Sequence, residues 1–218
     1  MVIKYIKRIA SVFIMVLLIF AFSACGQKTA PEQTKQSQQE ETKQQEQQNE
    51  TGEQNSNTIV VYFSATGNTQ TVADYITEEL NADTYQIIAA QEYTSDDLDW
   101  TDENSRVNVE HNDPNFRPEV AGELPDLTNY DTIFIGYPIW WGEAPNIVKG
   151  FVENVDFSNK TIIPFCTSSS SGIGSSGENL EALTSNANWL AGERFSSNVS
   201  RDDVVNWVNS VNGVAVNQ

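Results

Sequence analysis

The 218-residue chain has one histidine and two cysteines, and these shortages exclude several kinds of chemistry. A multi-histidine metal site needs several histidines, and a Ser-His-Asp triad needs one held beside its serine, so a single His111 in an acidic, loop-like region argues against both. His111 stands in an acidic stretch, and we interpret it as a solvated loop residue. Cys166 ends an apolar run with no histidine within motif distance, which indicates a buried thiol without a catalytic role.

Positive charge is also scarce, because 12 lysines and arginines face 30 aspartates and glutamates, which gives a formal net charge of −18. Basic and acidic residues are equal in number before residue 58, so the whole net charge lies on residues 58–218. Such a domain repels nucleic acid and anionic lipid, and attracts cations or basic proteins. We therefore expect no nucleic-acid partner, although solubility outside the cell would also explain the acidity.

The chain begins like a secretory signal. Lys4, Lys7 and Arg8 precede an apolar run over residues 9–22, which is short for a membrane span, and Ser23-Ala24-Cys25 closes it. The segment that ends at Cys25 resembles the lipobox of bacterial lipoproteins, although Phe22 stands where leucine is usual. The resemblance implies a signal peptide over 1–24, lipidation of Cys25, and attachment to the extracytoplasmic face of the cell membrane. An uncleaved anchor or plain secretion is the alternative.

The composition changes abruptly after Cys25. Residues 26–57 are dominated by glutamine, glutamate, threonine, asparagine and lysine, with no apolar periodicity. Such a stretch cannot bury a core, so we expect residues 25–57 to form the lipidated cysteine and a disordered tether. A coiled coil is the alternative, but no apolar seam supports it.

Residues 58–218 have the size of one domain, and their pattern alternates between strands and helices. Strands are expected at 59–63, 84–89, 132–136, 161–166 and 189–195. Helices are expected after the first, third, fourth and fifth strands. The helix after the third strand begins at Ala144-Pro145. The alternation predicts an α/β fold, with a doubly wound, five-stranded parallel sheet of order 2-1-3-4-5 and helices on both faces.

The turn that follows the first strand is the strongest functional signal. It reads Ser64-Ala65-Thr66-Gly67-Asn68-Thr69 and leads directly into a helical pattern. Hydroxyl donors and the free N–H groups of a helix start form an anion site, and Gly67 lets the backbone approach closely. The turn has no lysine, unlike the phosphate loop of nucleotide hydrolases. An ordinary polar turn is the alternative.

This turn resembles the phosphate loop of the flavodoxin family, and two later segments resemble the family's other flavin-contacting loops. The second is Tyr137-Pro138-Ile139-Trp140-Trp141-Gly142, and the third is Thr167-Ser168-Ser169-Ser170-Ser171-Gly172-Ile173-Gly174. The resemblance implies FMN as the cofactor. The implied FMN-binding residues are Ser64, Ala65, Thr66, Gly67, Asn68, Thr69, Pro138, Ile139, Trp140, Trp141, Gly142, Thr167, Ser168, Ser169, Ser170 and Gly172.

Two regions depart from a minimal flavodoxin. Ser169 and Ser170 stand where the longer bacterial branch of the family has glycines, which puts the affinity for flavin in doubt. Residues 91–130 form a long, acidic and irregular insertion, which resembles that branch. Irregular segments of this length are usually lids, binding loops or disordered. We expect a partly ordered flap beside the flavin, with a surface decoration as the alternative.

The leading hypothesis is a membrane-tethered, extracytoplasmic FMN protein that transfers electrons to or from an unidentified redox partner, and the acidity of the domain favours a basic one. The first alternative is an FMN-dependent NAD(P)H reductase of quinones or similar acceptors. The second is a lipoprotein that has lost its cofactor and serves in binding, against which the intact phosphate loop argues. Reaction of the flavin with NADH and NADPH would separate the first two.

Overall fold

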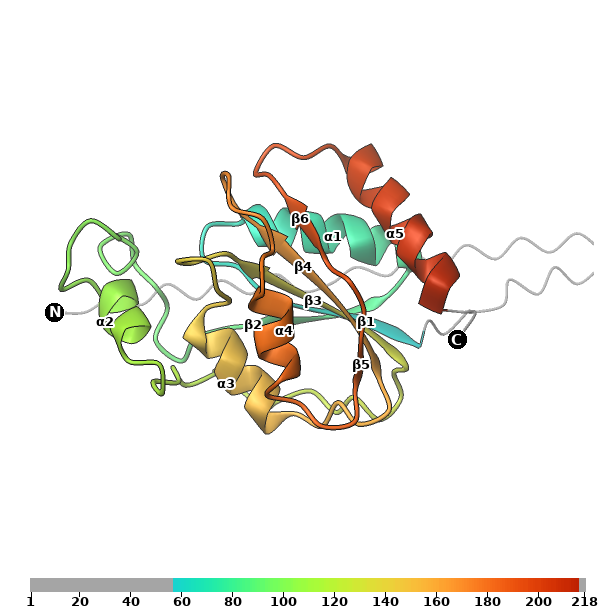
Figure 1. Ribbon diagram of the computed structural model, residues 1–218, viewed down its shortest axis with the longest axis horizontal. Coiled ribbons are helices and arrows are strands. Elements are labelled where there is room, and N and C mark those ends of the chain that lie inside the picture. The colour runs from blue at the N-terminus through green and yellow to red at the C-terminus, as the bar shows by residue number, and fades with distance from the viewer. Residues whose placement is uncertain (1–56, 216–218) are drawn as a thin grey trace, which may run out of the picture. The chain divides into compact units, whose positions relative to one another are not determined.

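The computed structural model of the protein describes residues 57–215, and of these the side chains of residues 57–211. The fold belongs to the α/β class and consists of one β-sheet with helices on both faces (Figure 1). Its strands are β1 (Thr58–Phe63), β2 (Asp83–Ile87), β3 (Thr132–Pro138), β4 (Thr161–Thr167), β5 (Asn188–Trp189) and β6 (Glu193–Phe195). Its helices are α1 (Asn68–Leu80), α2 (Arg106–Asn112), α3 (Asn146–Asn154), α4 (Ser176–Glu181) and α5 (Arg201–Ala215).

The sheet has the strand order β2-β1-β3-β4-β5, which confirms the predicted topology. All the pairings between its strands are parallel, and the register sets Val60 beside Phe134 and Phe134 beside Ile163. Central strands covered on both faces should read as nearly continuous apolar runs. β1, β3 and β4 do so, and all but their end residues are buried.

The last strand position differs from the prediction, because two short strands replace the expected single strand over 189–195. Ile162 pairs with Trp189 and Phe165 pairs with Glu193. Between these two pairs, the outer segment that contains β5 and β6 therefore has one residue more than β4. Leu190 N–H donates to Ile162 O at 2.9 Å, which shows that the even-numbered residues of β4 face this outer chain. Pro164 is one of them and has no N–H to donate, so the ladder breaks opposite it.

Two apolar layers cover the sheet. α1 and α5 pack on one face, where Val72, Ile76 and Val204 meet the side chains of the strands (Figure 1). α3 lies on the other face and buries Ile147, Val148, Phe151 and Val152, the stripe expected from its sequence. α5 begins after Ser200, whose Oγ accepts the Asp203 N–H at 3.2 Å, as expected for an N-terminal cap.

The insertion expected over residues 91–130 is ordered, and the chain enters and leaves it through two segments that are hydrogen-bonded to each other. Ala90 N–H donates to Glu119 O at 2.8 Å, and Ala121 N–H donates to Ile88 O at 2.7 Å. Between these points the chain forms turns and the short helix α2, which stands away from the sheet in Figure 1. The expected flap is therefore a folded segment with its own hydrogen bonds.

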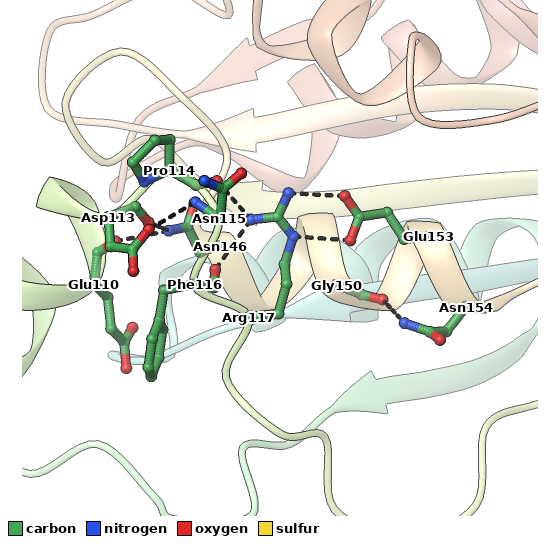
Figure 2. Close-up of polar contacts among 10 residues, drawn as sticks. All are labelled: Glu110, Asp113, Pro114, Asn115, Phe116, Arg117, Asn146, Gly150, Glu153 and Asn154. Carbon is green, nitrogen blue, oxygen red and sulfur yellow. Dashed lines mark hydrogen bonds and ion pairs between the residues drawn. The ribbon is translucent and has the colours of Figure 1, made fainter.

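Two polar side chains fasten this insertion to α3 (Figure 2). Arg117 donates to both carboxylate oxygens of Glu153, at 2.9 and 2.7 Å. Asn146, at the start of α3, donates from Nδ2 to Glu110 O at 2.7 Å and to Asp113 O at 3.1 Å. Bidentate arginine–carboxylate pairs fix geometry as well as adding energy, so the end of the insertion has a defined position on α3.

The expected signal peptide, the lipidation site Cys25 and nearly all of the expected tether lie outside the described residues. Within residues 57–215, no helix combines the length and the apolar character that crossing a membrane requires.

Gly136 in β3 permits close packing against the neighbouring strand. A Cβ at this position would lie 2.1 Å from the ring of Phe165, its cross-strand partner. We expect Gly136→Ala to lower the free energy of unfolding by about 1–3 kcal/mol, as overpacking of a core does, measured by urea denaturation.

Gly172→Ala is the matched control, because the nearest atom to its Cβ would be 4.0 Å away. In a Phe165→Leu background the loss caused by Gly136→Ala should be smaller, since the ring is gone. Equal losses in both backgrounds would show that the ring is not the obstacle.

Candidate functional site

The three loops singled out in the sequence follow β1, β3 and β4, and side by side they form one edge of the sheet. A buried hydrogen bond of 2.8 Å between the hydroxyls of Thr69 and Thr167 joins the first loop to the third. Ile139 N–H donates to Thr167 O at 2.9 Å and joins the second loop to the third. The three loops therefore have fixed positions relative to one another.

The first loop ends at the start of α1, where Gly67 is the N-terminal cap residue. Gly67 has a φ of +86°, a conformation that glycine adopts without strain, and no side chain caps the helix. The first N–H groups of a helix have no partner within it, so they are free to bind an anion. Ser64 Oγ accepts the Gly67 N–H at 3.1 Å, and Thr66 Oγ1 accepts from Asn68 Nδ2 at 3.2 Å. Both hydroxyls keep their own protons for a ligand.

The second loop is a tight two-residue turn. Trp140 and Glu143 exchange two backbone hydrogen bonds of 2.9 Å, and the residues between them have positive φ, +49° at Trp141 and +83° at Gly142. Positive φ at both central positions is typical of the hairpin turns that glycine and asparagine favour. Glu143 accepts from Asn179 Nδ2 at 2.8 and 2.9 Å, which ties the turn to α4.

The two tryptophans of this turn have different surroundings. Trp140 packs edge-on against Phe63 and Tyr93, with ring centroids 5.7 and 5.6 Å away. Trp141 is 42% exposed and stacks on His111, with centroids 4.4 Å apart. His111 is exposed, as expected, but it lies in α2 and not in a loop, because the insertion folds into a helix beside this turn.

The third loop is held by an arginine from β6. Arg194 donates from Nη2 to Ser168 O at 2.6 Å and from Nε to Ser168 Oγ at 3.0 Å, and Ser168 Oγ donates to Ser171 O. Cys166, just before this loop, is fully buried, which confirms its interpretation as a buried thiol. Burial raises the pKa of Cys166 to about 12, so the unreactive thiol form predominates at neutral pH.

A cavity of about 560 Å³ lies between these loops and the insertion. Ten residues of the three loops line it together with three residues of the insertion. The lining consists of Ala65, Thr66, Pro138, Ile139, Trp140, Trp141, Ser168, Ser169, Ser170 and Ser171, together with Leu98, Trp100 and Val107. No charged side chain of the described residues lines it.

Several of the residues proposed from sequence lie around this cavity without lining it. Ser64 and Gly67 precede α1, Asn68 and Thr69 begin it, and Gly142 lies in the tryptophan turn. Thr167 is the buried first residue of the third loop, and Gly172 follows the lining serines in the same loop.

Sequence reasoning missed Leu98, Trp100, Val107, Ser171, Arg194 and the contact of His111 with Trp141. The insertion has no periodic pattern that would have singled out its lining residues.

A buried carboxylate supports the insertion beneath the cavity. Glu110 is 4% exposed and accepts from Arg106 Nε at 2.6 Å and from the Tyr93 hydroxyl at 2.7 Å. The guanidinium of Arg106 also lies 3.9 Å from the centre of the Tyr93 ring. Burial and the Glu110 carboxylate raise the pKa of Tyr93 far above its usual value, so it remains a donor. Among residues 57–215, no cluster of three or more histidine, cysteine or acidic side chains is arranged to bind a metal.

Comparison with known families places most of the chain in one of them. The family model described as Flavodoxin matches residues 57–211. A crystal structure of a candidate flavoprotein from Bacteroides uniformis ATCC 8492 is 42% identical to the chain, with a TM-score of 0.67. The match covers 71% of this chain and 98% of that protein.

Two further similarities are more limited. A flavoprotein from Lactobacillus acidophilus NCFM, solved in complex with FMN, is 20% identical over 70% of this chain and 97% of that one, with a TM-score of 0.51, which shows a shared fold. The uncharacterized NAD(P)H oxidoreductase YcaK of Escherichia coli is 33% identical over 43 residues. That segment is 20% of this chain and about a fifth of the relative, 22% of its length.

Proposed function

The chain belongs to the flavodoxin family, and on that premise we propose that it binds FMN at the carboxyl edge of its sheet and transfers electrons from there. One observation carries the proposal. Three loops that the parallel sheet brings together surround an uncharged cavity beside the uncapped start of α1.

The donor set at this edge suits the separate parts of FMN. The phosphate is dianionic, and the free N–H groups of α1 with the hydroxyls of Ser64 and Thr66 would hold it without a cation. The flat, apolar ring system suits the lining of Ile139, Trp140 and Trp141, and its polar rim suits the third loop. FMN, when bound, supplies the electron transfer, and the protein supplies binding, orientation and exclusion of water.

Attachment to the membrane is the second part of the proposal. A basic start, an apolar run and a small-residue end before Cys25 support a lipoprotein signal. The lipidated Cys25 would anchor the chain, and about 30 residues of flexible tether would reach on the order of 30 Å from the extracytoplasmic face. The acidic domain at its end suits an exchange of electrons with a basic protein.

A reductase that takes electrons directly from NAD(P)H is the second candidate. The partial similarity to an NAD(P)H oxidoreductase favours it. The net charge of −18 disfavours it, because dinucleotides are anions.

The phosphate loop gives a test of FMN binding. The purified protein should be yellow, and Thr66→Val should weaken FMN binding by about 1.5–3 kcal/mol, because it deletes a donor to a charged group. Riboflavin has no phosphate, so its affinity should hardly change. Fluorescence titration of the FMN-free protein measures both ligands.

Thr128→Val is the matched control, since Thr128 is exposed and its hydroxyl donates to Asp126 in its own turn. It should leave both affinities unchanged. A colourless protein that takes up no added FMN would defeat the main proposal, and equal losses for FMN and riboflavin would locate the phosphate elsewhere.

Cys25→Ser tests the anchor. Removing the thiol removes the acylation site, so the variant should incorporate no labelled fatty acid and should leave the membrane fraction or remain unprocessed. Cys166→Ser is the control, because Cys166 is buried and should not affect labelling. Unchanged lipid incorporation in Cys25→Ser would contradict the lipoprotein proposal.

Stopped-flow mixing with NADH and NADPH under anaerobic conditions separates carrier from reductase. A carrier should show no saturable bleaching of the flavin by either nucleotide, whereas chemically reduced protein should pass electrons on. Rapid and saturable bleaching by one nucleotide would establish the reductase instead. If charge repulsion limits the reaction, added salt should accelerate it.

A further inference from the structure

The loops after β1, β3 and β4, called the flavin-type loops below, do not supply the whole wall of the cavity. Leu98, Trp100 and Val107 line it from the insertion. The described residues on the rest of the lining include no charged side chain. Trp100 is 72% exposed and Trp141 is 42% exposed. Single exposed apolar residues are normal on protein surfaces, but here two indoles and two aliphatic side chains border one cavity.

The turn that carries Trp100 is held in place by its own hydrogen bonds. Asn108, in α2, donates from Nδ2 to Trp100 O at 2.9 Å and to Asp102 O at 2.8 Å. Val107 N–H donates to Asp97 O at 3.1 Å, and Asp99 accepts from the Thr101 hydroxyl at 2.6 Å. An aromatic side chain on such a turn is presented to solvent with little freedom to lose when a ring binds it.

This turn is also fixed relative to the flavin-type loops. Tyr93, at the beginning of the insertion, packs against Trp140 of the second loop and hydrogen-bonds to Glu110 in α2. Asn146 of α3 binds the far end of α2 through Glu110 O and Asp113 O, as Figure 2 shows. The turn that carries Trp100 is thus joined by packing and hydrogen bonds to the loops on the other side of the cavity.

The charged residues that flank Trp100 in the sequence, over residues 93–104, all have one sign. Asp96, Asp99, Asp102 and Glu103 are exposed and flank it in the sequence, and no basic residue lies between residues 92 and 105. Hydrogen bonds from Thr101 lower the pKa of Asp99, which stays ionised at neutral pH. An anionic ligand would meet repulsion here and no countercharge in the cavity lining.

From this arrangement we propose that Leu98, Trp100 and Val107 form a second subsite, which binds a planar aromatic electron acceptor without negative charge beside the FMN. The proposal rests on the proposed function, since it deepens the role of the same cavity. For a quinone acceptor, two electrons pass from the reduced flavin, which is oxidised. The quinone takes one proton from that flavin and one from solvent and becomes the hydroquinone.

The experiment uses the FMN-loaded full-length chain as wild type, Trp100→Ala and Trp100→Phe, with 1,4-naphthoquinone as the probe. The affinity for FMN is measured first in each. Calorimetry then gives the affinity of the oxidised proteins for the quinone, which the oxidised flavin cannot reduce. Aromatic contacts are worth about 0.5–1.5 kcal/mol, so Trp100→Ala should weaken quinone binding roughly 2- to 12-fold, and Trp100→Phe should retain most of it.

The kinetic arm follows the reoxidation of protein reduced with dithionite. Trp100→Ala should slow reoxidation by naphthoquinone at subsaturating concentration by the same factor, and should leave reoxidation by dioxygen unchanged. Phe116→Ala is the matched control, because Phe116 is an exposed aromatic of the same insertion that does not line the cavity. Naphthoquinone-2-sulfonate should bind more weakly than naphthoquinone, and salt should narrow the gap.

The outcomes separate the two proposals. A wild-type chain that binds no FMN overturns the proposed function and this inference together. If FMN binds, then unchanged quinone affinity in Trp100→Ala, or an equal loss in Phe116→Ala, overturns the subsite alone. A sulfonate that binds as well as the uncharged quinone overturns the assigned charge preference.

Discussion

Parallel pairing of β1, β3 and β4 is the constraint on which the candidate site depends. Parallel strands must each end at the same edge, so the loops that follow them are neighbours although they are separated by about 30 to 100 residues in the chain. The buried bond between Thr69 and Thr167 is possible only because both residues stand at that edge. Each loop then needs only local features, a left-handed Gly67 or a tight turn at Trp141, to complete its shape.

Local patterns in the sequence were enough to predict the sheet order, the apolar stripes of the helices and the edge at which the loops meet. They failed where a single residue acts through a partner on another strand. Pro164 reads as part of a buried strand, and its missing N–H interrupts the neighbouring chain, which splits the expected fifth strand into β5 and β6. Only the register reveals that effect, because it depends on which neighbour Pro164 faces.

The insertion was the least predictable region for a different reason. Its order comes from side chains that bind backbone groups far away in the sequence, as Asn146 binds Glu110 O and Asp113 O. No periodic pattern marks such contacts, so Trp100 and Val107 could not be assigned to the cavity, and His111 could not be assigned to a helix beside Trp141. The three flavin-type loops were recognisable because each depends mainly on neighbouring residues.

The two ends of the insertion are held together by backbone hydrogen bonds between residues 88–90 and 119–121. A segment whose two ends are already paired with each other can be exchanged without altering the path of the strands. The cavity wall that the insertion supplies can therefore vary while the strands stay in place, provided that the packing of Tyr93 on Phe63 and Trp140 is kept. Under the subsite proposed above, exchanging this one module would change the choice of acceptor and leave the sheet as it is.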